Sequence, residues 1–294
     1  MELSLTEGQV CGWMPRRDPQ GHKGTFGKVD ILAGCEGFTG APVLAATAAV
    51  HGGTGLVFLQ VPRSIYPIVA VKCDEAMPSP LPDQGGQCAQ EAYDRILAKM
   101  STCDAGLIGP GLGRSEALDR LIPQLLTALS IPLVLDADGL NALSGHIDTL
   151  STRHAPTILT PHDGEFQRLT GHWPGTDRPA EARSLAERCG CVVVLKGHCT
   201  VIAGPDSTCY INTTGNAGMA KGGSGDVLAG LMVSFLAQGM APMEAAGAAV
   251  WVHGRAGDLC KQRFGERYMA PTDLIRMLAP VLKQLEEQHP PNQT

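Results

Sequence analysis

The stretch NAGMAKGGSGDVLAG, residues 216–230, contains five glycines among its fifteen residues and a single acid, Asp226. An apolar run over 227–238 follows directly and predicts a long buried helix. Glycine lowers helix stability and costs backbone entropy on folding. So much glycine at the start of a helix therefore indicates that something must approach the bare backbone there.

A glycine loop that leads into a helix presents unpaired N–H groups and the positive end of the helix dipole, which together attract an anion. Gly222, Gly223 and Gly225 would let a phosphate come close to the backbone. Asp226 would repel that phosphate, unless it accepts a proton from a hydroxyl that attacks the phosphorus. The alternative is that Asp226 only caps the helix. The segment is not a P-loop, because no Gly-Lys-Ser/Thr occurs at the required spacing.

On both sides of this stretch, apolar strands alternate with helical patterns along the chain, which is typical of a mostly parallel sheet covered by helices on both faces. The segments that contain a strand are 28–34, 54–62, 105–113, 131–143, 156–171 and 191–197. The predicted helices cover 41–53, 90–102, 115–129, 179–190, 227–238, 243–260 and 270–288. The sequence thus predicts the α/β class.

Three further segments complete this organisation. Residues 200–212 predict a hairpin, and the proline-rich stretch 78–86 predicts a surface loop. Because that loop lies inside one alternating pattern, it does not mark a domain boundary. We therefore expect a single domain over 1–294, with a core at about 15–285.

Chemistry-bearing residues follow the predicted strands, which is where ligands collect in such sheets. The segments that follow strands are GPGLG (109–113), DADGLN (136–141), TPHDGE (160–165) and KGHCT (196–200), and GGSGD (222–226) precedes a helix. Each is a weak signal alone. Five of them in one chain predict a common site at the carboxyl edge of the sheet.

Composition and charge exclude several classes of function. The net charge of −6 and the sequence pI of about 5.8 argue against nucleic-acid binding. No uncharged apolar run is long enough to span a membrane. The first residues, MELSLTEGQV, show no secretory signal. The ten scattered cysteines are expected to be free thiols in a reducing cytoplasm.

Taken together, these motifs resemble the ribokinase-like superfamily, and within it the NAD(P)H-hydrate dehydratase family. The resemblance runs in order from about Pro15 to Pro271. It is carried by HKGTFGKVDILAG (22–34), GFTGAPVLAATAAVHGGTGLV (37–57), GPGLG, LDADGLNAL (135–143), TPHDGEFQRLTG, VVLKGHCTVI (193–202), NAGMAKGGSGDVLAG and LAQG (236–239). It implies a three-layer ribokinase-like sandwich.

The resemblance implies a reaction in which a nucleotide drives the removal of water from the S-epimer of NAD(P)H hydrate (NADHX or NADPHX). The hydrate hydroxyl is phosphorylated and phosphate is then eliminated, so that ADP becomes AMP and NADH or NADPH is restored. The donor is ADP in most bacterial members and ATP in eukaryotic ones, with Mg²⁺ as its counterion. Asp226 would be the base that deprotonates the hydroxyl.

The resemblance also assigns the remaining site residues. The amides of Gly223, Ser224 and Gly225 would form an anion hole. Residues expected to contact the hydrate are Ala41, Gly111, Gly113, His162 and Asp226. Residues expected to bind the nucleotide are Lys196, Gly197, His198, Cys199, Thr200, Asn216 and Gly225. Glu165 could help hold metal or water near the phosphates, and Asp138 and Asn141 would lie near the phosphates or the nicotinamide.

Several of these residues have simpler interpretations. Lys196 could pair with a nearby acid at a strand end, and His162 could belong only to a turn. For Asp136 we favour capping of the following helix. His51 and His253, on apolar helices, are expected to be packed or surface histidines rather than ligands.

The chain departs from the family pattern at three positions. Asp163 stands where proline is usual and adds a charge near the substrate. Cys35 and Phe38 replace a common serine and tyrosine, and Phe38 lacks a hydroxyl that could bridge subunits.

The resemblance implies a homo-oligomer, commonly a tetramer. No epimerase domain is recognised, so we expect dehydratase activity alone, with any epimerase a separate protein. The two rival functions are a vitamin-precursor kinase of the same superfamily and a non-catalytic nucleotide-binding protein. The intact Asp226 and its glycines argue against the second, and KGHCT with TPHDGE argues against the first.

Overall fold

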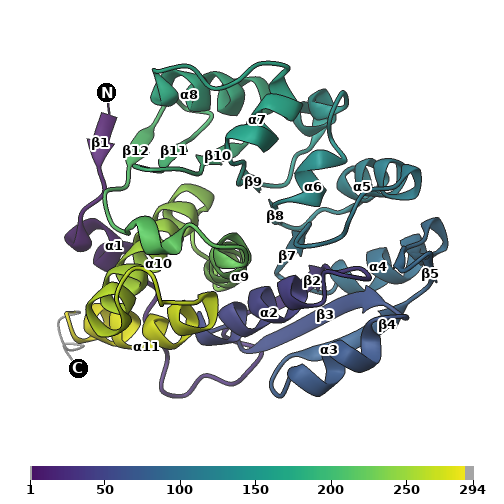
Figure 1. Cartoon of the computed structure of the whole chain (residues 1–294), viewed down its shortest axis with the longest axis horizontal. Helices are drawn as coiled ribbons and strands as arrows, with labels where there is room; N and C mark the ends of the chain where they lie inside the picture. The colour runs from purple at the N-terminus through teal and green to yellow at the C-terminus, as the bar shows by residue number, and fades with distance from the viewer. Residues whose placement is uncertain (1, 289–294) are drawn as a thin grey trace.

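One ten-stranded sheet runs through the part of the chain that the computed structural model describes, residues 2–288 (Figure 1). Its strand order is β1-β12-β11-β10-β9-β8-β7-β2-β3-β4. Neighbouring strands are parallel except at β11, which is antiparallel to β10 and β12. The strands are β1 (Glu2–Ser4), β2 (Lys28–Leu32), β3 (Leu56–Pro62), β4 (Met77–Leu81), β7 (Ala105–Ile108), β8 (Leu133–Leu135), β9 (Thr157–Leu159), β10 (Val192–Leu195), β11 (Val201–Ala203) and β12 (Cys209–Ile211). A separate two-stranded sheet pairs β5 (Asp83–Gln84) with β6 (Gln87–Cys88).

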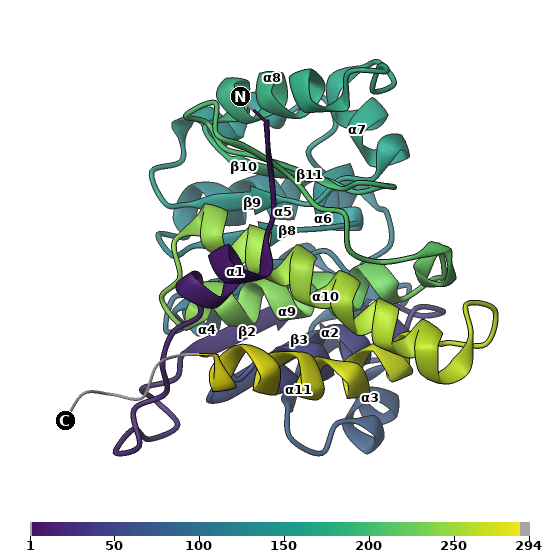
Figure 2. The ribbon, with the colours of Figure 1, turned by 90° about the vertical axis from the view of Figure 1, so that its left-hand side faces the viewer.

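Helices cover both faces of the large sheet. One apolar core packs the sheet against α1 (Glu7–Trp13), α2 (Gly40–His51), α3 (Tyr66–Lys72), α9 (Ser224–Ala237), α10 (Pro242–Phe264) and α11 (Pro271–Glu287). The opposite core packs it against α4 (Tyr93–Met100), α5 (Glu116–Ala128), α6 (Asp138–Asn141), α7 (Asp163–Thr170) and α8 (Arg178–Cys189). Short 3₁₀ helices are η1 (Gln90–Ala92), η2 (Ile147–Thr152) and η3 (Ala217–Met219). Figure 2 shows α10 and α11 side by side across one face.

This arrangement confirms the predicted α/β class and follows from the apolar runs in the sequence. Every residue of the central strands β7, β8, β9 and β10 is buried. Parallel strands covered on both faces require such runs, because both sides of each strand face a hydrophobic core. Burying each large aliphatic side chain contributes about 1.5–3 kcal/mol relative to leaving it exposed.

The prediction of a surface loop over 78–86 is wrong at its start. Residues 77–81 form β4, which pairs with β3 in parallel and is the last strand of the sheet. Pro78 and Pro80 cannot donate to a neighbouring strand, and proline is tolerated at an edge for that reason. The pattern also missed β1, α1 and α3, which are short elements.

Gly230, inside α9, permits a close approach between α9 and α2. A Cβ at this position would lie 2.1 Å from the carbonyl oxygen of Ala45 in α2. We therefore expect Gly230→Ala to lower the free energy of unfolding by about 3 kcal/mol, because the two helices must separate. Urea denaturation measures this change. Gly222→Ala is the matched control: no atom lies within 4 Å of its added Cβ, so its stability should stay at the wild-type value. A wild-type midpoint for Gly230→Ala would contradict the close packing.

All ten cysteines are unpaired, and eight of them are buried. Burial raises the pKa of the Cys88 and Cys191 thiols to about 12, so these thiols stay protonated at neutral pH. Over residues 2–288, no helix combines the length and the apolar character needed to cross a membrane.

Candidate active site

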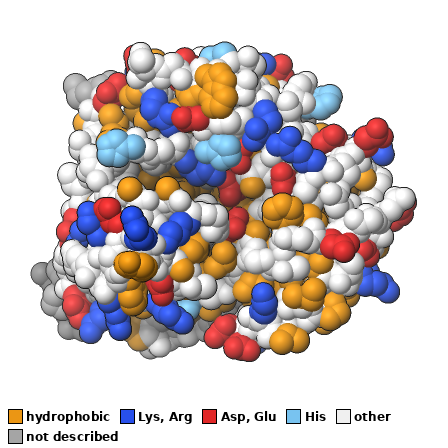
Figure 3. Space-filling view, viewed as in Figure 1, with side chains coloured by type: hydrophobic (Ala, Val, Ile, Leu, Met, Phe, Trp, Pro, Cys, Tyr) orange, Lys and Arg blue, Asp and Glu red, His pale blue; other side chains and the backbone are white. Residues whose placement is uncertain are grey.

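The polar segments predicted to share a site do come together at the carboxyl edge of the sheet. They follow β7, β8, β9 and β10, and the N-terminus of α9 faces them, since Gly225 lies beside Lys196 and Asp136. Figure 3 shows that this face of the molecule is hollowed near its centre, with acidic and basic side chains at the hollow and a histidine at its rim.

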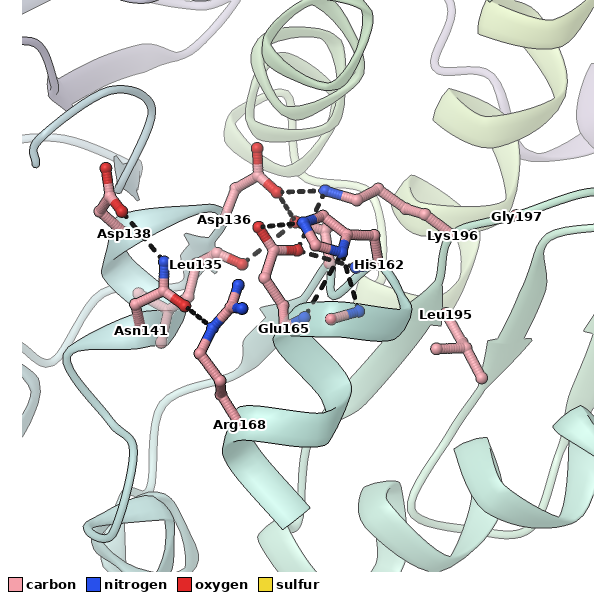
Figure 4. Close-up of polar contacts among 12 residues, drawn as sticks. Leu135, Asp136, Asp138, Asn141, His162, Glu165, Arg168, Leu195, Lys196 and Gly197 are labelled. Atoms are coloured by element: carbon pink, nitrogen blue, oxygen red, sulfur yellow. Dashed lines mark hydrogen bonds and ion pairs between the residues drawn. The ribbon is translucent and has the colours of Figure 1, made fainter. Parts of the chain in front are cut away.

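Lys196, which follows β10, extends its ammonium group between two buried carboxylates (Figure 4). Its Nζ lies 2.7 Å from Asp136 Oδ1 and 3.5 Å from Glu165 Oε2. Burial opposes the charge on Lys196, but the two carboxylates outweigh it and raise the pKa of the lysine. The cluster thus holds one fixed positive charge between two negative ones.

The prediction that Asp136 caps a helix is wrong. The residue before α6 is Ala137, and no side chain caps this helix. The Asp136 carboxylate instead accepts hydrogen bonds from Lys196 Nζ and from Thr160 Oγ1, the latter at 2.7 Å. The alternative interpretation of Lys196, pairing with an acid at a strand end, is confirmed.

His162 and Glu165 form a reciprocal cap at the start of α7. His162 Nδ1 accepts from the Gly164 N–H at 3.0 Å, and Glu165 Oε2 accepts from the His162 N–H at 2.8 Å. Such capping boxes satisfy the free N–H groups of a first helical turn. The other carboxylate oxygen of Glu165 lies 3.3 Å from His162 Nε2. The cap fixes the orientation of the exposed imidazole, and contact of His162 with the hydrate stays a prediction.

Asp226 lies in the first turn of α9 without capping it. The N-cap is Gly223, which has φ +100° and makes no side-chain bond. The pKa of Asp226 is raised to about 7, first by burial and then by the nearby negative charge of Asp136; Lys196 opposes the rise. A carboxyl group with a pKa near neutrality can accept a proton at physiological pH, as a general base must.

Glycine suits two positions before Asp226 for different reasons. Gly223 needs its positive φ, and a Cβ there would lie 2.7 Å from Leu44 Cδ1. A Cβ on Gly225 would point toward Lys196 Nζ at 3.7 Å and would occupy space inside the site. The start of α9 is therefore rich in glycine because the loop needs this residue both for its turn and for an open backbone.

The GPGLG loop after β7 packs on the turn before α2. A Cβ on Gly111 would lie 2.9 Å from Ala41 Cβ, so these two predicted substrate-binding residues are neighbours. Gly113 lies against Cys35, and its N–H donates to Asp138 Oδ2 at 2.8 Å. Phe38, on the same turn, is 58% exposed.

A second polar network borders the site, and one of its members was missed by the sequence analysis. Asn141 Nδ2 donates to Asp138 Oδ1 at 3.0 Å, and Arg168 Nε donates to Asn141 Oδ1 at 2.6 Å. Arg168 comes from α7, so the network joins α6 to α7 (Figure 4). Arg168 lies within the stretch TPHDGEFQRLTG, but the sequence analysis assigned it no role, because a single arginine in a helix carries no signal of its own.

The segment 197–200 forms a tight loop beside Lys196. Thr200 Oγ1 donates to the carbonyl of Gly197 at 3.0 Å, and Cys199 has φ +57°, a conformation uncommon for a residue other than glycine. His198 is exposed. Asn216 lies on a different segment, where its amide donates to Asp258 Oδ1 at 3.2 Å. Asp258 is a second contact that the sequence did not reveal.

His253 is packed inside α10, as predicted. Its side chain is buried, and burial lowers its pKa to about 4, so the imidazole is neutral.

Within residues 2–288, no three His, Cys, Asp or Glu side chains form a group able to hold a metal ion.

A glycine-rich helix N-terminus with an acid in its first turn, at the carboxyl edge of a mostly parallel sheet covered by helices on both faces, places the chain among ribokinase-like proteins. The sequence model of the NAD(P)H-hydrate dehydratase family matches residues 29–280. The chain belongs to this family.

Individual relatives agree with that assignment. The chain is 40% identical to the ADP-dependent (S)-NAD(P)H-hydrate dehydratase of Neisseria meningitidis, over 85% of this chain and 82% of the relative. It resembles the crystal structure of the ADP/ATP-dependent NAD(P)H-hydrate dehydratase of Bacillus subtilis, co-crystallized with ATP/Mg²⁺, with a TM-score of 0.84 and 32% identity over 97% and 99% of the two chains.

Longer relatives also match. The chain is 43% identical to the bifunctional NAD(P)H-hydrate repair enzyme Nnr of Moorella thermoacetica, over 97% of this chain but 54% of the relative. The chain thus spans about half the length of such bifunctional enzymes.

Proposed function

We propose that this chain catalyses the nucleotide-dependent dehydration of the S-epimer of NAD(P)H hydrate, which restores NADH or NADPH. The observation that carries the proposal is the position of Asp226. Its carboxyl group, with a pKa of about 7, lies in the first turn of α9 beside the glycine amides of the anion hole. Membership of the dehydratase family supports the choice of reaction.

The chemistry assigned to these residues has two stages. Asp226 accepts the proton of the hydrate hydroxyl, and the hydroxyl oxygen forms a bond to the terminal phosphorus of the nucleotide as the bond to the leaving group breaks. ADP becomes AMP in this stage. Phosphate then leaves with the former hydroxyl oxygen, and loss of a proton from the adjacent ring carbon restores the reduced nicotinamide. The amides of Gly223, Ser224 and Gly225 stabilise the negative charge on the transferred group.

Mg²⁺ fits this site as the companion of the nucleotide phosphates, a role in which it uses one or two carboxylates and several waters. Asp136 and Glu165 already contact Lys196, and Glu165 also accepts from the His162 N–H. Asp138 already accepts hydrogen bonds from the Gly113 N–H and from Asn141 Nδ2, so these carboxylates have few lone pairs left for a metal ion. Mg²⁺ would neutralise phosphate charge, and the role of Glu165 as a ligand stays a prediction.

The remaining assignments also stay predictions. They include the hydrate contacts of Ala41, Gly111, Gly113 and His162, the nucleotide contacts of 196–200 and Asn216, and a single domain over 1–294. The same holds for the tetramer, a separate epimerase and a cytoplasmic location. Contact between Ala41 and Gly111, and between Gly225 and Lys196, supports the grouping of these residues in one site.

The decisive test uses purified protein, chemically prepared NADH hydrate and Mg²⁺, with ADP and ATP added in separate reactions. The absorbance of reduced nicotinamide should rise only when a nucleotide is present, and AMP or ADP should form in equal amount. The faster donor identifies the physiological nucleotide. A folded protein that binds nucleotide but produces no reduced nicotinamide would contradict the dehydratase and favour a vitamin-precursor kinase.

A further inference from the structure

Arg178, the first residue of α8, joins two segments of the site that are separate in sequence. Its Nη1 donates to Asp163 Oδ1 at 2.6 Å, and its Nη2 donates to the carbonyl of Lys196 at 2.8 Å. The arginine side chain is 23% exposed, and its Nε is buried without a partner. A planar guanidinium suits this task, because its donors are fixed in a fork that can satisfy two acceptors at once.

Each end of this bridge lies beside residues of the site. Asp163 is the first residue of α7, next to the His162 and Glu165 cap. Lys196 directs its ammonium group toward Asp136, while its backbone carbonyl faces Arg178. Arg178 therefore holds the backbone of the residue whose side chain contacts the Asp136 and Glu165 carboxylates.

The loop after Lys196 lies directly on the guanidinium group. A Cβ added to Gly197 would be 2.8 Å from Arg178 Nη2 and 3.3 Å from Cζ. Glycine at 197 thus lets the backbone of the 197–200 loop rest against Arg178. Arg178 thus joins this loop to α7 from one side, beside the hydrogen bond that the Lys196 N–H donates to the Pro161 carbonyl at 2.8 Å.

We propose that Arg178 is a positioning residue that couples the 197–200 loop to the start of α7 and thereby sets the affinity for nucleotide. The proposal rests on the proposed function, which assigns nucleotide binding to this loop. Asp163 is its anchor, so the residue that departs from the family pattern serves to orient Arg178.

The first test is the dissociation constant of ADP and ATP, measured by calorimetry with Mg²⁺ for Arg178→Gln. We expect it to rise about tenfold, because the loop loses its support; a tenfold change corresponds to about 1.4 kcal/mol. The turnover number at saturating nucleotide should change far less than KM. Arg178→Lys keeps the charge but not the fork, so it should recover only part of the affinity.

The chain offers a matched control on the same helix. Arg188 in α8 also pairs with an aspartate, Asp148, at 2.8 Å, and both side chains are exposed. Arg188→Gln should leave nucleotide affinity at the wild-type value. Equal weakening by Arg188→Gln and Arg178→Gln would overturn the proposal, because it would point to a general effect on α8.

Asp163→Pro tests the anchor without disturbing Arg178 itself. Proline suits the first position of a helix, and His162 before it already has the extended ψ of 173° that proline requires. We expect nucleotide affinity to fall about threefold, and the Asp163→Pro/Arg178→Gln double variant to bind no more weakly than Arg178→Gln alone, as coupled residues do. If Arg178→Gln does not fold, the nucleotide affinity of Asp163→Pro alone tests the proposal. Wild-type affinity in Asp163→Pro would then overturn the proposal.

Calorimetry keeps this test separate from the test of the reaction. A wild-type chain that binds nucleotide but does not restore NADH would contradict the proposed function, while the Arg178 variants could still be compared. A lowered Tm in Arg178→Gln with an unchanged dissociation constant would overturn the positioning role, because it would show a purely structural one.

Discussion

Replacing Asp226 by asparagine is expected to lower the turnover number about 10³-fold, within the range that general-base catalysis contributes. Asparagine has nearly the same shape but cannot accept the hydroxyl proton. Nucleotide affinity should be retained, because the amides of Gly223, Ser224 and Gly225 are unchanged. Steady-state kinetics and calorimetry on the same preparation measure the two effects. Turnover at the wild-type rate would show that Asp226 is not the base.

The raised pKa of Asp226 also predicts how activity depends on pH. Only the ionised carboxylate can accept a proton, so kcat/KM should rise with pH to a plateau, with an apparent pKa of about 7. Asp226→Asn should remove this limb from any residual activity. The pH dependence of nucleotide binding, measured separately, serves as the control for titration of the phosphates.

As pH rises, stability should fall while activity increases. The pKa of Asp226 is about 7 in the folded protein and 3.8 as its ordinary value, so the folded state binds this proton more tightly. Stability is therefore lost as pH rises between these two values. Asp226→Asn should unfold at a higher temperature than wild type at pH 8, and this difference should shrink toward pH 4. A lower Tm for the variant at pH 8 would contradict burial of the charge.

Replacing Lys196 by methionine is the substitution expected to cost most stability. Asp136 and Glu165 are 3% and 5% exposed, and both would lose the ammonium group that lies between them. Removing one partner of a buried ion pair typically costs about 3–5 kcal/mol, because the other charge stays buried without compensation. Urea denaturation at pH 7 measures this loss.

The matched control for Lys196→Met is Lys283→Met, which removes an exposed lysine that pairs with Glu287 at 3.6 Å. Exposed pairs contribute at most about 1 kcal/mol, so this variant should denature close to wild type. Lys196 also lowers the pKa of Asp226. Any residual activity of Lys196→Met should therefore need a higher pH than wild type. An unchanged denaturation midpoint would contradict the burial of the cluster.

Several properties of the chain could be predicted from its sequence. The alternating apolar strands and helical patterns gave the α/β class, because helices and strands have different periods that local sequence records. Site segments could be placed as well, since the carboxyl ends of parallel strands meet at one edge. The glycines before Asp226 predicted a tight turn with an open backbone at the start of α9, where Gly223 has the positive φ that few other residues adopt.

Other properties were decided only by the tertiary structure. Lys196 and Asp136 are 60 positions apart, and the sequence pointed to a helix cap for Asp136 rather than to their ion pair. Arg168 and Arg178 contact partners 27 and 15 positions away, and no sequence pattern indicated those contacts. The sequence did not show that β4 is an edge strand, and only an edge strand tolerates prolines such as Pro78 and Pro80. Pairing, burial and the pKa of Asp226 depend on distances between remote segments, and local sequence patterns do not encode those distances.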